Sequence, residues 1–185
     1  MGADLASGPA ARHRMTSREL AIWRSWIDTT EELRRILSAE LQESGLSAAD
    51  YQVLLALREA DGRRLRSSVL AASIGWERSR LSHHLGRMER RGLIQRDDCA
   101  TDSRGAEVSI TDGGANLFQR ATVPHLRSVK RYFADALTAG QLDALAAILQ
   151  ALRVHLASTM LVVPPTHQRA HAWPPETSSI WSQVR

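Results

Sequence analysis

The feature that most constrains the fold is a pair of short helical patterns joined by a glycine turn. Residues 65–73 predict one helix, and residues 76–91 predict a second helix after Gly75, which allows a tight turn. The apolar positions of the second helix are spaced by four and three residues: Leu81, Leu85 and Met88. This spacing predicts that one face of the helix is buried and the other exposed.

A β-hairpin is predicted directly after this helix pair. Gly92 supplies a left-handed helix end, and residues 93–96 and 106–110 have the pattern of two short strands. The residues between them, 97–105, are polar and rich in turn formers, as expected for a hairpin tip. Two helices across a turn followed by a hairpin predict a winged helix-turn-helix.

Longer helices are predicted on both sides of this unit. Thr16 and Glu19 form a capping box before a helix whose apolar stripe includes Leu20, Trp23, Ile27, Leu33, Leu37 and Leu41. Ser47 caps a further helix that precedes the helix pair. Thr111 caps a helix that Pro124 is expected to kink or break, and Thr138 begins a last helix that is rich in leucine.

The predicted fold class is therefore mainly α with a small β-hairpin wing. We expect a winged helix-turn-helix core flanked by N- and C-terminal dimerisation helices, because the flanking helices are more apolar than one small module needs. The predicted organisation is a flexible N-terminal arm (1–15), an N-terminal dimerisation helix (16–46), the DNA-binding domain (47–110), C-terminal dimerisation helices (111–158) and a tail (159–185).

Basic residues are concentrated in the predicted module. The segment from Gly62 to Arg104 contains ten arginines and five acidic residues, whereas the whole chain carries a net charge of only +4. Arginine binds phosphates and guanine edges through its planar fork of donors. This clustering favours a polyanionic partner over an ordinary solvated face.

The same sequence argues against other classes of protein. It shows no Walker loop, no arrangement of nucleophile, base and acid, and no histidine spacing typical of a metal site, so no enzyme, cofactor or metal is expected. The apolar stretch from Leu137 to Leu156 is interrupted by Asp143, Arg153 and His155, so no membrane span is expected. A single cysteine, Cys99, and the lack of a signal-peptide pattern at the start suit a reducing cytoplasm.

Several short motifs resemble the MarR family of bacterial regulators. The family's step from recognition helix to wing is similar to Gly92-Leu93-Ile94-Gln95-Arg96. Its wing motif Asp-x-Arg is similar to Asp102-Ser103-Arg104. The motif Leu-Thr-x-x-Gly that follows the wing is similar to Ile110-Thr111-Asp112-Gly113-Gly114. Leu70-Ala71 and Arg78-Ser79 also fall where the family has these pairs. The resemblance covers roughly Thr16 to Ser158, and the order and spacing of the motifs carry it.

Three positions depart from the family pattern. Glu77 stands where the family often has a Ser or Thr cap, Gly86 replaces a usual acidic residue, and His84 occupies a position that is normally aliphatic. Gly86 lies inside the predicted recognition helix, where it is expected to cost about 1 kcal/mol relative to alanine. Glu77 is expected to be a poorer helix cap than Ser or Thr.

The candidate DNA contacts lie on the recognition helix and the wing. On the helix they are Arg78, Ser79, Arg80, Ser82, His83 and Arg87. Arg78 and Ser79 are expected to read bases, and Arg87 to meet phosphate. On the wing, Arg104 is expected to enter the minor groove while Asp102 holds its guanidinium.

Two further features each admit a functional and a structural interpretation. Trp23 and Trp26 are candidates to line a ligand cavity, although tryptophans at helical spacing more often belong to a core. Cys99 lies in the predicted wing near arginines, but Asp97, Asp98 and Asp102 oppose thiolate formation, so the sequence favours a bystander over a redox sensor and leaves a redox role open.

The resemblance implies an obligate homodimer, palindromic double-stranded DNA sites and a small-molecule effector that releases DNA, and we expect a repressor. One alternative is a winged-helix protein-interaction module without a specific DNA target, which the exposed arginines disfavour. A second alternative is an enzyme with an appended helix-turn-helix, but the chain outside the helix-turn-helix is too short for a catalytic domain. The operator, the effector and the choice between repression and activation stay open, as does the role of the tail.

Overall fold

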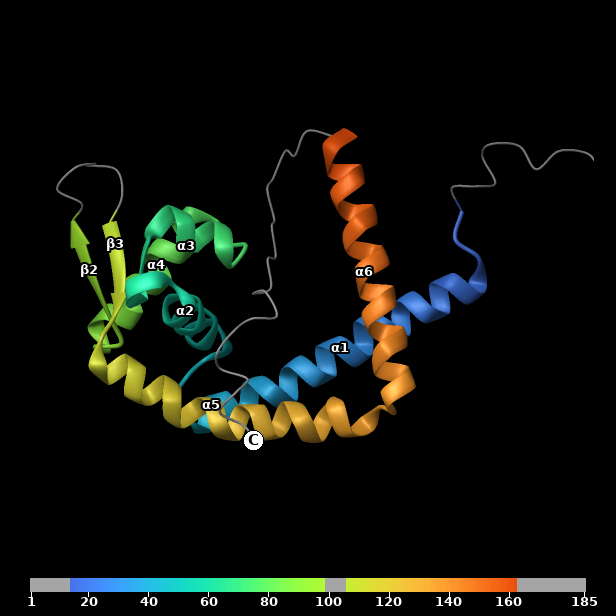
Figure 1. Cartoon of the computed structure of the whole chain (residues 1–185), viewed down its shortest axis with the longest axis horizontal. Coiled ribbons are helices and arrows are strands. Elements are labelled where there is room, and N and C mark those ends of the chain that lie inside the picture. Colours follow the sequence, from blue (N-terminus) through green and yellow to red (C-terminus); the bar gives the residue numbers. More distant parts are fainter. Residues whose placement is uncertain (1–13, 99–105, 163–185) are drawn as a thin grey trace, which may run out of the picture.

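The computed structural model describes residues 14–98 and 106–162. A small lobe contains the helix-turn-helix and the hairpin, and long helices extend away from it (Figure 1). In chain order the elements are α1 (Ser17–Glu43), α2 (Ala48–Glu59), η2 (Asp61–Arg63), β1 (Arg64–Arg66), α3 (Ser67–Ser73), α4 (Arg78–Arg90), β2 (Ile94–Asp98), β3 (Ala106–Ile110), α5 (Asp112–Tyr132), η3 (Ala134–Ala136) and α6 (Ala139–Val162).

The helix starts follow the local capping chemistry of the sequence. Thr16 and Glu19 form the predicted capping box of α1, and Ser47 and Asp50 form a second box at α2. Thr111 accepts a hydrogen bond from the backbone N–H of Gly114 and so caps α5. Each cap satisfies backbone donors that the first helical turn leaves free, which is why short motifs locate these starts well.

A three-stranded antiparallel sheet replaces the predicted two-stranded hairpin. Its strand order is β1-β3-β2, and β1 pairs with β3 through Leu65 and Val108. The prediction of a helix over residues 65–73 was wrong at its start, because residues 64–66 join the sheet and α3 begins at Ser67. The pairing partner of β1 lies more than forty positions along the chain, so no local pattern reveals it.

Two other helix expectations need correction. The second helix of the pair begins at Arg78 and not at Trp76, and Glu77 at its N-cap makes no side-chain capping hydrogen bond. The break considered at Pro124 does not occur, because α5 continues through it from Asp112 to Tyr132. Proline removes one backbone donor, but Phe118, Ala121 and Leu126 are buried on either side of it and hold the helix together.

One hydrophobic core lies under the helix-turn-helix. The largest fully buried side chains come from α2, α3, α4 and the sheet, together with Leu46 before α2: Leu46, Leu54, Leu57, Leu70, Leu81, Leu85, Met88, Ile94, Val53 and Val108. The predicted buried face of α4 is confirmed by Leu81, Leu85 and Met88. The core fixes which face of α4 remains outside.

The apolar stripe of α1 is buried only near its C-terminal end. Leu41 is 3 % exposed, whereas Trp23 is 54 % exposed and Trp26 42 %. In α6, Ile148 and Leu152 are also about half exposed. Across residues 14–98 and 106–162, no helix is both long and apolar enough to cross a membrane.

Candidate nucleic-acid interface

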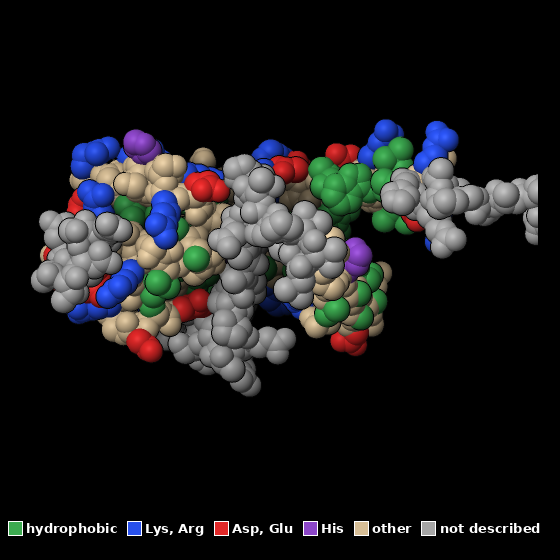
Figure 2. Space-filling model, turned by 90° about the horizontal axis from the view of Figure 1, so that it is seen from above, with side chains coloured by type: hydrophobic (Ala, Val, Ile, Leu, Met, Phe, Trp, Pro, Cys, Tyr) green, Lys and Arg blue, Asp and Glu red, His purple; other side chains and the backbone are tan. Residues whose placement is uncertain are grey.

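The exposed face of α4 brings together the six helical candidates. Arg78, Ser79, Arg80, Ser82, His83 and Arg87 all lie outside the core. Leu81, His84, Leu85 and Met88 are buried on the opposite side. Blue Lys and Arg side chains gather over the end of the molecule that holds α3, α4 and the hairpin (Figure 2). The arrangement gives a helix that can enter a major groove with its polar face forward.

The turn before α4 sets its direction. Gly75 has a φ of +67°, a conformation that favours glycine, and Trp76 donates its backbone N–H to the carbonyl of Ala71 at 2.9 Å. Trp76 is half-buried against the core, and its ring centroid lies 4.3 Å from the Arg80 guanidinium carbon. This cation–π contact limits the freedom of Arg80 at the start of α4.

The hairpin is tied to α4 by an ion pair. Arg96 on β2 donates from Nε to Glu89 Oε2 at 2.8 Å, and its backbone N–H donates to Glu89 Oε1 at 3.2 Å. The side-chain hydrogen bond from Arg96 lowers the pKa of Glu89, so this carboxylate remains charged and bound. The contact therefore fixes the base of the wing relative to the recognition helix.

The junction between α4, the wing and α5 depends on a close backbone approach. Thr111 donates its hydroxyl to the carbonyl of Gly92 at 2.6 Å, and its backbone N–H donates to the carbonyl of Leu93 at 3.2 Å. A Cβ atom at Gly114 would lie 1.9 Å from the Leu93 carbonyl oxygen. The Thr-x-x-Gly motif thus has a physical cause, since only glycine fits at its last position.

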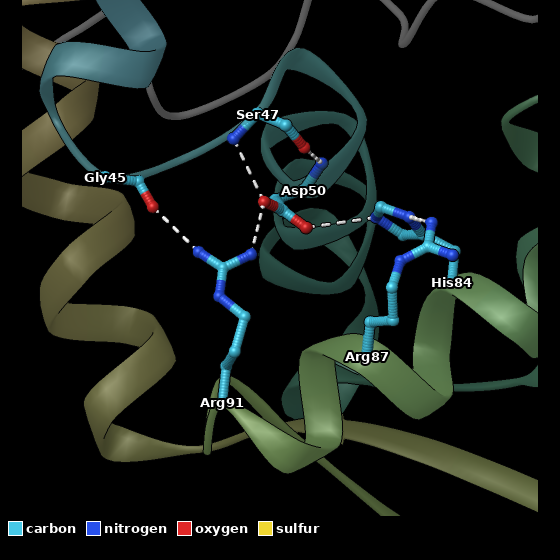
Figure 3. Close-up of polar contacts among 6 residues, drawn as sticks. All are labelled: Gly45, Ser47, Asp50, His84, Arg87 and Arg91. Carbon is cyan, nitrogen blue, oxygen red and sulfur yellow. Dashed lines mark hydrogen bonds and ion pairs between the residues drawn. The ribbon is translucent and has the colours of Figure 1, made fainter.

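A buried polar cluster under α4 was missed by sequence reasoning. Asp50 of α2 accepts hydrogen bonds from the Ser47 backbone N–H at 2.9 Å and from Arg91 Nη1 at 2.7 Å, and it contacts His84 (Figure 3). Arg91 also donates to the carbonyl of Gly45 at 2.8 Å. The one sequence signal was His84 itself, a polar residue at a position that the helical period marks as buried.

The wing candidates Asp102 and Arg104 lie outside the described residues, as does Cys99. The proposed roles of these three residues therefore stay predictions from the sequence. The strands that lead into and out of the wing, β2 and β3, pair from Ile94 with Ile110 to Asp98 with Ala106.

A cavity of about 670 Å³ lies between α1, α2 and α5, below the helix-turn-helix. Its lining is mostly apolar and includes Leu33, Leu37, Tyr51, Leu55, Leu65, Ile74 and His125. Trp23 and Trp26, the predicted ligand contacts, do not line it, because they lie further toward the exposed N-terminal half of α1. The helical spacing of Leu33 and Leu37 placed both residues on the apolar stripe of α1, but it did not show that they line a cavity.

Comparison with known proteins identifies the family. The MarR family model matches residues 44–105. AbsC, a MarR family transcriptional regulator from Streptomyces coelicolor, is 34 % identical, with a TM-score of 0.73 over 79 % of this chain and 99 % of AbsC. The chain belongs to the MarR family of transcriptional regulators.

Two further solved structures are similar. Sco3205, a MarR family transcriptional regulator from Streptomyces coelicolor solved in complex with DNA, is 34 % identical, with a TM-score of 0.72 over 77 % of this chain and 94 % of Sco3205. The organohalide-sensing regulator RdhR-CbdbA1625, solved with 2,4-dichlorophenol bound, is 22 % identical, with a TM-score of 0.68 over 89 % of this chain and 94 % of its own. No curated protein sequence matched the chain.

These findings confirm the predicted family and the mainly helical winged-helix fold. Members of this family are transcriptional regulators and not enzymes, so the chain is a MarR family transcriptional regulator.

Proposed function

We propose that this MarR family regulator is a homodimeric repressor that binds a pseudo-palindromic operator and is released by a small apolar effector. The observation that carries the proposal is the two-faced character of α4. Its inner face is buried in the core, and its outer face carries arginines and short hydroxyl side chains. Such side chains suit base edges and phosphates in the major groove.

Dimerisation is supported by apolar residues that the single chain leaves exposed. On α1 these are Leu20, Ile22, Trp23, Trp26 and Ile27, and on α6 they are Ile148, Leu152, Val154 and Leu156. Hydrophobic side chains, shown in green, gather over α1 and over α6 (Figure 2). A second copy of the chain would cover both surfaces and present two recognition helices to two half-sites.

Release by an effector is supported by the cavity beneath the helix-turn-helix. Its size suits a small organic molecule, and its lining is largely apolar. His125 lines it, and its Nδ1 atom is buried without a hydrogen-bond partner among the described residues. We therefore expect an apolar effector with one polar group that pairs with His125, a chemistry in keeping with the chlorophenol bound by RdhR-CbdbA1625. Trp23 and Trp26 stay candidate contacts only if the dimer brings them to a ligand.

The first test is selection of DNA from a random duplex pool by the full-length protein. We expect an inverted repeat whose half-site centres lie about one helical turn, or a multiple of it, apart. Sedimentation at micromolar concentration is expected to give twice the chain mass of 20.5 kDa. A clean monomer that selects no sequence would favour the protein-interaction module instead.

The second test separates base contacts from phosphate contacts. Arg78→Ala is expected to weaken binding to the selected duplex by about 1–3 kcal/mol and to relax base preference. Arg87→Ala is expected to weaken binding to selected and unrelated duplexes equally, with a shallower salt dependence. If the two variants behave alike on both duplexes, the assignment of these roles is wrong.

A further inference from the structure

His84 links a buried carboxylate to an arginine on the outer face of the recognition helix. It is 7 % exposed, and its Nε2 atom lies 3.0 Å from Asp50 Oδ1, whereas its Nδ1 atom lies 2.9 Å from Arg87 Nη2 (Figure 3). The contact at Nε2 brings the imidazole ring against the charge of the Asp50 carboxylate. Asp50, His84 and Arg87 thus form a chain from the core to the DNA-facing surface.

Asp50 is a fixed anion at the inner end of this chain. Burial is the largest influence on its pKa and raises it, but the interactions with His84, Arg91 and Ser47 together lower the pKa well below the ordinary value. The residue is 2 % exposed, and its position is set by the α2 capping box. It therefore presents a permanent negative charge to the ring of His84.

The chemistry of the partners sets the tautomer of His84. A guanidinium group has only donors, so Nδ1 must be unprotonated in order to accept from Arg87 Nη2. In the neutral ring the proton is then on Nε2, where it faces the Asp50 carboxylate. The negative charge of Asp50 beside Nε2 thus favours the tautomer in which Nδ1 is unprotonated and can accept from Arg87.

We propose that His84, with Asp50 behind it, is a positioning residue that holds Arg87 ready to bind a DNA phosphate. The proposal rests on the proposed function, in which Arg87 contacts the phosphate backbone of DNA. Arg87 uses one N–H on His84 and keeps its other donors for an anion. A side chain ordered before binding loses less rotamer entropy when DNA arrives.

The competing interpretation is that His84 only packs α4 against α2. Its ring does contact Trp76, with centroids 5.3 Å apart and an edge-on angle of 80°. The two interpretations differ in their dependence on Arg87. A positioning effect disappears when Arg87 is removed, whereas a packing effect remains.

The experiment measures binding of the full-length protein to two probes by fluorescence anisotropy over a range of salt concentrations. The probes are a duplex selected from a random pool by the wild type and an unrelated duplex of equal length. His84→Leu keeps the bulk and removes the acceptor, and we expect it to weaken binding to both probes by about three- to tenfold, as losing one preordered side chain implies. His84→Asn places an oxygen near the position of Nδ1, and it is expected to stay within about twofold of the wild type.

The decisive variant combines His84→Leu with Arg87→Ala. We expect it to bind both probes as Arg87→Ala does. If His84→Leu binds like the wild type, or weakens binding by the same factor in the Arg87→Ala background, the positioning role is overturned. A wild type that selects no duplex from the random pool would overturn the proposed function instead, so the two failures are distinguishable.

A second measurement does not depend on how well the His84 variants fold. The nitrogen-15 NMR spectrum of the wild-type imidazoles is expected to show His84 with the proton on Nε2 and a bare Nδ1. Arg87→Ala is expected to shift the Nδ1 signal of His84. A proton on Nδ1 in the wild type at neutral pH would contradict the proposal.

Discussion

Gly114 provides the sharpest test of how the DNA-binding unit is joined to α5. It lies in the first turn of α5 with no positive φ, so its backbone conformation suits any residue. Space is what excludes a side chain, because a Cβ atom would lie 1.9 Å from the Leu93 carbonyl oxygen and 2.8 Å from its carbonyl carbon. The obstacle is backbone and cannot rotate away.

The expected cost of Gly114→Ala follows from two opposing effects. Overpacking by one methyl group against a fixed neighbour costs about 1–3 kcal/mol or more, because helix and strand must move apart to relieve the contact. Alanine gains about 1 kcal/mol over glycine within a helix, and less near its first turn. Because the obstacle is backbone, the cost lies at the upper end of this range, about 3 kcal/mol or more, and we expect a net loss of about 2 kcal/mol or more in the free energy of unfolding.

Gly86→Ala is the matched control. Gly86 lies inside α4, and the nearest atom to a Cβ placed there is the flexible end of Arg90 at 3.8 Å. The same substitution is expected to stabilise the protein by up to about 1 kcal/mol. Urea unfolding followed by circular dichroism gives both values. If Gly114→Ala is as stable as the wild type, the close contact with Leu93 does not hold α5, and the reasoning fails.

Three further predictions concern charge and assembly. Burial lowers the pKa of His125, so the unfolded chain takes up a proton before the folded chain does as pH falls through about 6.5. Stability should therefore decrease as pH falls below about 6.5, and it should decrease less in His125→Phe; equal pH profiles for the two proteins would contradict this cause. Ile148→Glu and Leu152→Glu should each give a monomer in sedimentation with unchanged helix content, because both side chains are exposed in the single chain. Variants that stay dimeric would show that the interface lies elsewhere. Asp102→Asn should weaken operator binding if Asp102 orients Arg104, whereas tighter binding would show that the acid only repels phosphate.

Local chemistry explains what the sequence predicted well. The capping pairs Thr16 with Glu19 and Ser47 with Asp50 act within three residues, and the buried face of α4 follows from helical spacing. These features depend on neighbouring residues only, so they can be recognised without knowing the rest of the fold. The family motif at the start of α5 is only partly local, because Thr111 caps the helix three residues away, whereas Gly114 is required by the backbone of the distant residue Leu93.

Contacts between distant segments decided the rest. β1 exists because Leu65 lies beside Val108, and α5 continues through Pro124 because packing on both sides outweighs one lost hydrogen bond. The sequence by itself determined most of the helices, the caps of α1, α2 and α5, and the outer face of α4, because these follow from spacing and local hydrogen bonds. Only the tertiary structure decided where the cavity lies and that Asp50 meets His84, because a buried charge finds its partners through the packing of helices and not through sequence distance.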